Sequence, residues 1–193
     1  MTMIQVKQIN TYYTQMGEGY DVVCLVGWGQ DTRMFEPTQT YLSKRFRVTC
    51  VDYPGFGQTE LMKEAWSVDD YVSWLNDFLT QLNISHPIII AHSFGARVAL
   101  KYNLLYPIRK LVFTGAAGIR PKRKLSTQIR IRVYKILKRL VQLPGLSMFQ
   151  EDLKKMFGSE DYRSISGVLR DSFVRIVNED LSGILKEVKV PCL

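Results

Sequence analysis

One short segment of this sequence combines a nucleophilic side chain with a pattern that would expose it. The segment Ile88–Ala96 reads IIIAHSFGA, so an apolar run leads to Ser93 and a helical pattern starts directly after it. Small residues flank the serine at two positions, Ala91 before it and Gly95 after it. A sharp strand-to-helix turn leaves no room for bulk there, and it holds the serine hydroxyl above the sheet, as nucleophilic catalysis requires. The alternative interpretation is a strand-to-helix turn with a purely structural role.

The elements around Ser93 predict an α/β sheet, because apolar runs alternate with amphipathic segments over the first 118 residues. Four apolar runs predict strands: Asp21–Val26, Phe46–Val51, Ile88–Ala91 and Lys110–Thr114. Ahead of them, the loose alternation of Ile4–Gln15 predicts an opening hairpin.

Two helices are expected between these strands. Ser67 and Asp70 have the spacing of a capping box, and the apolar residues that follow recur at helical spacing as far as Leu82. A second helix, Gly95–Tyr102, links the third and fourth strands. Parallel strands joined by helical crossovers predict a doubly wound, mostly parallel sheet.

After Gly118 the signals are helical only. Ser126–Leu143 has one apolar face and one basic face, and Ser159 precedes a helix with apolar residues facing inward, namely Ile165, Val168, Leu169, Phe173, Ile176 and Val177. Val188–Leu193 looks like the approach to a new buried strand. We therefore divide the chain into a core over residues 1–117, a helical cap over 118–185, and the start of a return to the core over 186–193.

Four features in the same order resemble the α/β-hydrolase family, over nearly the whole chain. They are the serine turn with Ala91 at the usual first glycine, the loop Val26–Gln30 (VGWGQ) with Val26 where the family usually has His, the loop Asp52–Gly57 (DYPGFG), and the helix Trp66–Leu82. The resemblance implies a serine hydrolase with a helical cap over the doubly wound sheet, and no cofactor or metal. The serine separates it from the dehalogenase and epoxide-hydrolase branches, which use Asp at that position.

The resemblance also implies roles for individual residues. Ser93 would be the nucleophile, and the backbone N–H groups of Phe94 and Trp28 would stabilise the oxyanion. The side chains of Trp28 and Phe94 would line a substrate pocket or pack in the core, and both interpretations stay open. Asp52 and Gly55 are expected to shape their loop rather than to catalyse. The substrate would be a small ester, lactone, amide or activated C–C bond.

The catalytic acid and base are not found in the sequence. The order in this family is serine, acid, histidine, yet the only histidines are His86, before the serine strand, and His92, beside Ser93. The segment Thr114–Gly118 offers no acid either. We therefore expect a hydrolase cut before its acid, its base and its last strands, which is inactive as it stands and prone to self-association through an exposed sheet edge. The alternative is a non-catalytic remnant or interaction protein that keeps the fold.

Composition limits the function classes. The 193 residues are 46% hydrophobic and 23% charged, which is typical of a globular domain. No apolar run is long enough to span a bilayer, and the first residues lack the pattern of a signal peptide. Three scattered cysteines favour a reducing, cytoplasmic setting over a disulfide framework or metal cluster, and Cys24 and Cys50 are expected on neighbouring strands without a bridge.

The net charge of +8 is local. Residues 78–150 contain 13 of the 26 basic residues and no acidic residue. The simplest interpretation of the basic helix face in residues 120–139 is a solvated surface. The alternatives are binding to an anionic membrane surface and steering of an acidic substrate. No nucleic-acid-binding module accompanies this charge, so we expect a small-molecule substrate and no nucleic acid.

Overall fold

The computed structural model describes residues 2–119 and 167–193. The predicted helix Ser126–Leu143, its basic face and the start of the helix expected after Ser159 lie outside the described residues. The proposed division into a core and a cap is therefore not tested by the structure.

The described residues form a six-stranded sheet in the order β1-β2-β4-β3-β5-β6. The strands are β1 (Thr2–Val6), β2 (Ile9–Met16), β3 (Tyr20–Leu25), β4 (Phe46–Val51), β5 (Ile88–His92) and β6 (Lys110–Thr114). β1 and β2 form the expected antiparallel hairpin, and β2 pairs with β4 antiparallel. β4, β3, β5 and β6 are mutually parallel. The hairpin, the four predicted strands and the mostly parallel sheet are all confirmed.

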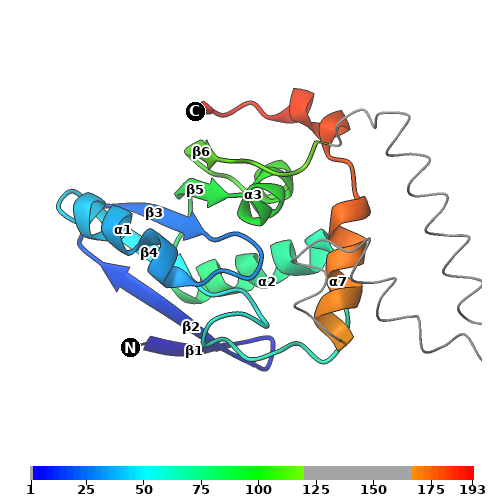
Figure 1. Ribbon diagram of the computed structural model, residues 1–193. Coiled ribbons are helices and arrows are strands. Elements are labelled where there is room, and N and C mark those ends of the chain that lie inside the picture. Colours follow the sequence, from blue (N-terminus) through cyan, green and yellow to red (C-terminus); the bar gives the residue numbers. More distant parts are fainter. Residues whose placement is uncertain (1, 120–166) are drawn as a thin grey trace, which may run out of the picture.

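Helices lie between β3 and β4, between β4 and β5, between β5 and β6, and after β6 in the chain (Figure 1). They are η1 (Thr32–Phe35), α1 (Glu36–Leu42), α2 (Val68–Gln81), α3 (Phe94–Leu105), α7 (Gly167–Asn178) and η3 (Ser182–Glu187). α1 packs against β4, whereas α2 and α3 pack against each other. α7 stands at the end of the sheet toward which β3 and β5 point (Figure 1). The carboxyl ends of the strands, where ligands bind in open α/β sheets, therefore face α7.

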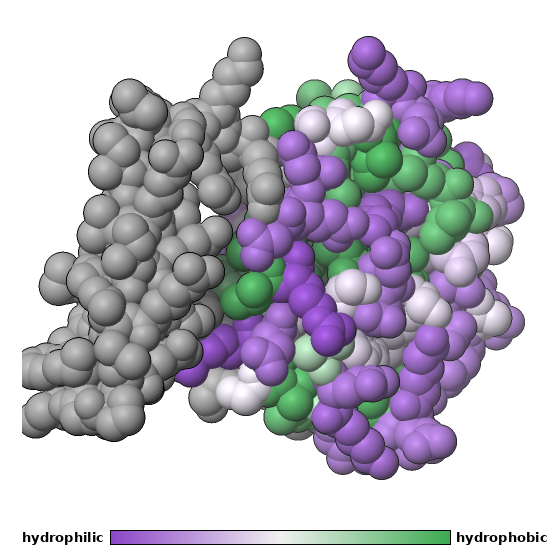
Figure 2. Space-filling model, turned by 90° about the vertical axis from the view of Figure 1, so that its right-hand side faces the viewer, coloured by the Kyte–Doolittle hydropathy of each residue, from purple (hydrophilic) through white to green (hydrophobic). Residues whose placement is uncertain are grey.

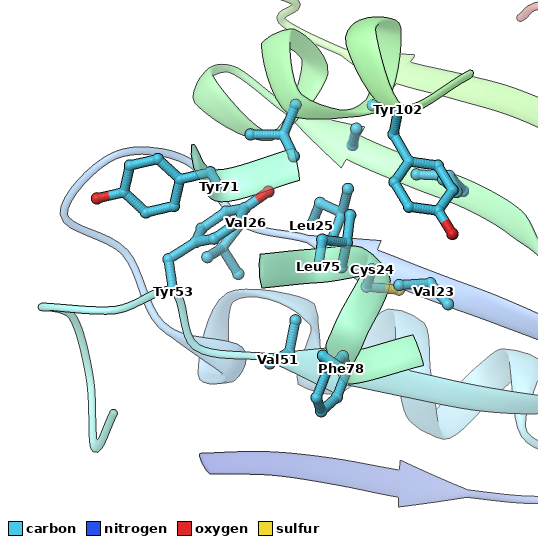
Figure 3. Packing of buried hydrophobic residues seen from close by; sticks show 14 of the residues in the cluster. Val23, Cys24, Leu25, Val26, Val51, Tyr53, Tyr71, Leu75, Phe78 and Tyr102 are labelled. Atoms are coloured by element: carbon cyan, nitrogen blue, oxygen red, sulfur yellow. The ribbon is translucent and has the colours of Figure 1, made fainter. Parts of the chain in front are cut away.

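The start of α2 confirms the predicted capping box. The Ser67 hydroxyl accepts a hydrogen bond from the Asp70 N–H, and the Asp70 carboxylate accepts one from the Ser67 N–H at 2.7 Å. These bonds satisfy two donors that a helix terminus would otherwise leave free. Figure 3 shows side chains of α2 meeting those of β3 and β4 in the core, including Leu75, Phe78 and Val51.

Two cysteines lie opposite each other on neighbouring strands. Cys24 of β3 and Cys50 of β4 are register partners, and both are buried and free. A hydrogen bond that the Cys24 thiol donates to Cys50 and burial together raise the pKa of Cys24. Both thiols belong to the core, and the Cys24 thiol carries no negative charge at neutral pH.

The last residues run beside β6. The Leu111 N–H donates to the Pro191 carbonyl at 3.0 Å, and the Leu193 N–H donates to the Leu111 carbonyl at 3.0 Å. This parallel pairing places the end of the segment beside β6, where Leu193 is 88% exposed. Within this segment, Val188 and Val190 pack against the core.

The predicted inward face of α7 needs one correction. Ile176 is buried, and Val168, Leu169 and Phe173 are half-buried, as expected. Val177, however, is 39% exposed. Ser172 and Ile176 define the buried stripe by their four-residue spacing, and Val177 lies about 100° further around the helix.

No helix within residues 2–119 and 167–193 is both long and apolar enough to cross a bilayer. On the face shown in Figure 2, hydrophilic residues form most of the described surface and hydrophobic residues form small patches between them.

The capping box at the start of α2 yields a stability prediction. We expect Ser67→Ala to lower the free energy of unfolding by about 1 kcal/mol, because the Asp70 N–H loses its acceptor. Chemical denaturation of the two proteins measures the difference. Ser85→Ala, at an exposed loop position, is the matched control and should change stability by less than about 0.5 kcal/mol. Equal effects of the two substitutions would contradict the capping role.

Candidate active site

The segment that carries Ser93 forms a sharp turn between β5 and α3. Ser93 has φ 46° and ψ −108°, a conformation that non-glycine residues rarely adopt, and it is the N-cap of α3. Such backbone strain costs roughly 1–3 kcal/mol and persists only where the surroundings enforce it. The strand, turn and helix therefore meet at the residue where the sequence predicts the nucleophile.

The small residues that flank Ser93 are required by close packing. A Cβ added at Gly95 would collide with the backbone carbonyls of Leu25 and Val26, at the end of β3. Ala91 is fully buried and pairs with Leu25 on one side and Phe113 on the other. α3 can therefore approach the carboxyl end of β3 only with glycine at position 95.

Backbone hydrogen bonds hold the turn in place. The Ser93 N–H donates to the Thr114 carbonyl at 3.3 Å, and the Ser93 carbonyl accepts from the N–H groups of Ala96 at 3.1 Å and Ala117 at 3.2 Å. The segment Gly115–Gly118, which offers no acid, thus supports the turn. Phe94 is the first residue of α3, where backbone N–H groups have no acceptor within the helix. Its N–H is therefore suited to bind developing negative charge.

The side chain of Gln30 closes the loop after β3, and no local sequence pattern predicts this contact. The Gln30 carboxamide oxygen accepts from the Gly27 N–H at 2.9 Å, and the Gln30 N–H donates to the Gly27 carbonyl at 3.2 Å. A Cβ at Gly27 would collide with that carboxamide. Val26, at the position where the family usually has His, is fully buried. Gln30 therefore supplies a local hydrogen bond that fixes the loop carrying Trp28.

Asp52 fastens two loops together. Its carboxylate accepts from the backbone N–H of Thr32 at 2.6 Å and from that of Gln58 at 2.9 Å. A Cβ at Gly57, whose φ is +55°, would collide with this carboxylate. Burial raises the pKa of Asp52, although the two backbone hydrogen bonds oppose that change. These contacts fit the expected loop-shaping role. Gly55 (φ +88°) occupies a backbone conformation that favours glycine, and its Cβ position faces Leu169 of α7.

The side chains of Trp28 and Phe94 pack together beside the turn. Their ring centroids lie 5.3 Å apart, and Trp28 also contacts Phe56 at 4.8 Å and Phe173 of α7 at 5.4 Å. The Trp28 indole N–H is buried without a hydrogen-bond partner in the described part of the chain. Both side chains therefore form one aromatic wall, contributed by the loop after β3, the start of α3, and α7.

Beneath this wall lie Tyr53 and Tyr71, each with its ring about 5 Å from that of Phe94 (5.1 Å and 5.0 Å). Burial raises the pKa of both phenols, and their hydroxyl groups point in different directions in Figure 3. Neither phenol is therefore ionised at neutral pH.

The two histidines do not complete a catalytic triad. His92 Nδ1 lies 3.1 Å from the Thr114 hydroxyl on β6, so this ring nitrogen is engaged with the neighbouring strand. His86 is exposed in the loop before β5, at the end of that strand opposite Ser93. Among the described residues, the structure thus brings Ser93, Phe94 and Trp28 together without giving the serine a histidine base.

A family model described as the alpha/beta hydrolase fold matches residues 21–143. This chain belongs to that family. The match includes the loop after β3, the loop after β4 and the Ser93 turn.

Individual relatives agree with this assignment. A Shewanella woodyi protein named pimeloyl-(acyl-carrier protein) methyl ester esterase is 29% identical over 198 residues, covering 92% of this chain and 75% of the esterase. The solved structure of an esterase from Exiguobacterium antarcticum has a TM-score of 0.70 and 25% identity, over 99% of this chain and 78% of that one. The enol-lactonase of Burkholderia xenovorans has a TM-score of 0.71 and 18% identity, over 99% and 79%. The chain is a hydrolase-family protein by these comparisons.

The contact between α3 and β3 gives a second stability prediction. We expect Gly95→Ala to destabilise the protein by about 1–3 kcal/mol or more, because the new methyl group meets two rigid carbonyl groups. Thermal or chemical unfolding measures this loss. Gly183→Ala in η3 is the control, since a Cβ there meets nothing within 4 Å. The packing explanation fails if both variants are equally stable.

The raised pKa of Asp52 gives a pH prediction. A carboxyl with a higher pKa in the folded state binds protons more tightly when folded, so its contribution to stability increases as pH falls through that pKa toward the unfolded value of about 3.9. We expect the free-energy difference between the wild type and Asp52→Asn, which does not titrate, to change in favour of the wild type over this interval. Urea unfolding between about pH 7 and 4 measures it. A difference that moves the other way as pH falls would contradict the raised pKa.

Proposed function

We propose that this protein is of the serine hydrolase class and that Ser93 is its nucleophile. The observation that carries the proposal is the strained Ser93 conformation at the N-terminus of α3, with glycine required at position 95. This geometry supports a hydroxyl held at the carboxyl end of β5, which is where a nucleophile of this fold is expected. The family match and the hydrolase names of relatives support the same reaction class.

The proposed chemistry is acyl transfer. The Ser93 oxygen attacks the carbonyl carbon of the substrate, its proton passes to a base, and the carbonyl oxygen becomes an oxyanion. The backbone N–H groups of Phe94 and Trp28 stabilise that charge, with Gln30 fixing the loop of the second donor. Collapse of the intermediate expels the leaving group, and water then hydrolyses the acyl-enzyme. The residues proposed for this reaction need no metal or cofactor.

The base limits the activity of these 193 residues. The sequence contains two histidines, one engaged with Thr114 and one beyond the far end of β5. We therefore propose that this chain, by itself, turns over substrate slowly or not at all. A cytoplasmic location and self-association through a sheet edge also stay predictions.

The substrate class follows from the aromatic wall. Phe56 and Phe94 are buried in the core, whereas Trp28 and Phe173 are half-buried. Trp28 and Phe173 therefore favour an apolar group next to the reacting carbonyl, and a small ester or lactone offers both parts. The relatives include a protein named as a methyl ester esterase, which supports an ester as the substrate class.

The second candidate is a non-catalytic remnant or interaction protein. The engaged His92 favours it, because the ring nitrogen Nδ1 of the histidine beside Ser93 contacts the Thr114 hydroxyl. The suggested binding of the basic face to a membrane surface involves residues outside the described ranges and stays a prediction.

A fluorophosphonate probe tests the proposed nucleophile. We expect it to label Ser93 slowly, as identified by mass spectrometry of the tryptic peptide, because the turn presents the hydroxyl next to the oxyanion donors while the described residues supply no histidine base. Ser93→Ala should abolish labelling, whereas Ser85→Ala should retain it. Labelling that survives Ser93→Ala would contradict the assignment. Rapid hydrolysis of p-nitrophenyl acetate that depends on Ser93 would instead contradict the proposed lack of turnover.

A further inference from the structure

The aromatic wall depends on a helix from a distant part of the chain. Phe173 of α7 contacts Trp28, and Leu169 of α7 packs at the position of Gly55. The other members of the wall come from the loops after β3 and β4 and from α3. The placement of α7 therefore decides how closely the wall is packed.

Polar contacts from the middle and the end of α7 hold this helix against the loop before α2. The buried Ser172 hydroxyl accepts from the Trp66 N–H at 2.9 Å and donates to the Val168 carbonyl at 2.8 Å. Further along, the Arg175 guanidinium donates to the Ala65 carbonyl at 2.6 Å. These bonds fix α7 to the loop that leads into α2, but they do not connect it to the serine turn.

The connection to the serine turn lies just after α7. Arg97 donates to the Glu179 backbone carbonyl at 2.9 Å, and the Lys101 ammonium contacts the Glu179 carboxylate at 2.5 Å and the Asp69 carboxylate at 2.6 Å. Arg97 and Lys101 are four residues apart on α3, so they lie on one face of that helix. We refer to Arg97, Lys101, Asp69 and Glu179 as the clasp.

The clasp is more sheltered than most surface ion pairs. Arg97 is 7% exposed, and the Lys101 side chain is 17% exposed. Burial would lower the pKa of Lys101, but its two carboxylate partners raise it above the ordinary value. Lys101 therefore stays charged at neutral pH. A backbone hydrogen bond adds to the clasp, because the Leu181 N–H donates to the Gly118 carbonyl at 2.9 Å.

We propose that Arg97 and Lys101 are positioning residues that couple the nucleophile helix to α7 and thereby set which substrates the Ser93 site accepts. The clasp binds α3 at its fourth and eighth residues, and Ser93 is the N-cap of that helix. Loosening it lets α7 and Phe173 move away from Trp28, which widens the space beside the oxyanion donors. The consequence for substrates rests on the proposed function, whereas the coupling itself does not.

Hydrogen exchange on the full chain tests the coupling. We expect Lys101→Met and Glu179→Gln each to increase amide exchange in Gly167–Asn178 by about tenfold, while β5 keeps its protection. The double variant should exchange no faster than the faster single variant, because both substitutions remove the same ion pair between Lys101 and Glu179. Lys7→Met is the control, since Lys7 has its own hydrogen bond to Ser73 and a 3.7 Å ion pair with Asp77, far from α7 in the sequence. Unchanged exchange in α7, equal loss of protection in β5, or additive effects would overturn the coupling.

Two fluorophosphonate probes of different size test the effect on selectivity. We expect Lys101→Met to raise the ratio of bulky-probe to small-probe labelling of Ser93 several-fold over wild type, whereas a general loss of stability would slow both probes alike. An unchanged ratio together with faster exchange in α7 would overturn the role in selectivity. Absence of labelling in the wild type would count against the proposed nucleophile, and the exchange experiment would still decide the coupling.

Discussion

The close approach of α3 to the carboxyl end of β3 is the constraint on which the site depends. At position 95 only glycine fits against the carbonyls of Leu25 and Val26, because any side chain would collide with them. Ala91 is fully buried between the neighbouring strands. With α3 held so near the sheet, the chain must turn abruptly at Ser93 and adopt a positive φ. Hydrogen bonds from the segment after β6 offset that strain. The position of the serine is therefore a consequence of backbone packing rather than of its own side-chain contacts.

Three loops at one end of the sheet and the helix α7 build the rest of the site. Gln30 closes the loop after β3, and Asp52 joins that region to the loop after β4 through two backbone N–H groups. The loop after β6 supports the serine turn, and α7 covers the aromatic wall. Because every loop starts from a strand of one sheet with a single buried core, their relative positions are fixed by the same packing.

Much of this arrangement could be predicted from local patterns. The run Asp21–Val26 predicts a strand buried on both faces, and Ser67 with Asp70 predicts the start of α2, because both signals lie within a few neighbouring residues. The sequence does not predict the contacts of Gln30, Arg97 and Lys101, because folding decides which partners their side chains meet. Lys101 meets Glu179, which is 78 residues away in the sequence. The predicted inward position of Val177 is wrong, because periodicity alone locates the border of a buried helix face only to within one residue.

A crystal structure of the fluorophosphonate-treated protein tests the central claim most directly, because it shows both the nucleophile and the oxyanion donors. The account predicts a covalent bond from phosphorus to the Ser93 oxygen, with a phosphoryl oxygen about 2.7–3.1 Å from the backbone nitrogens of both Phe94 and Trp28. An adduct on another residue, or a phosphoryl oxygen that faces away from these two N–H groups, would contradict it.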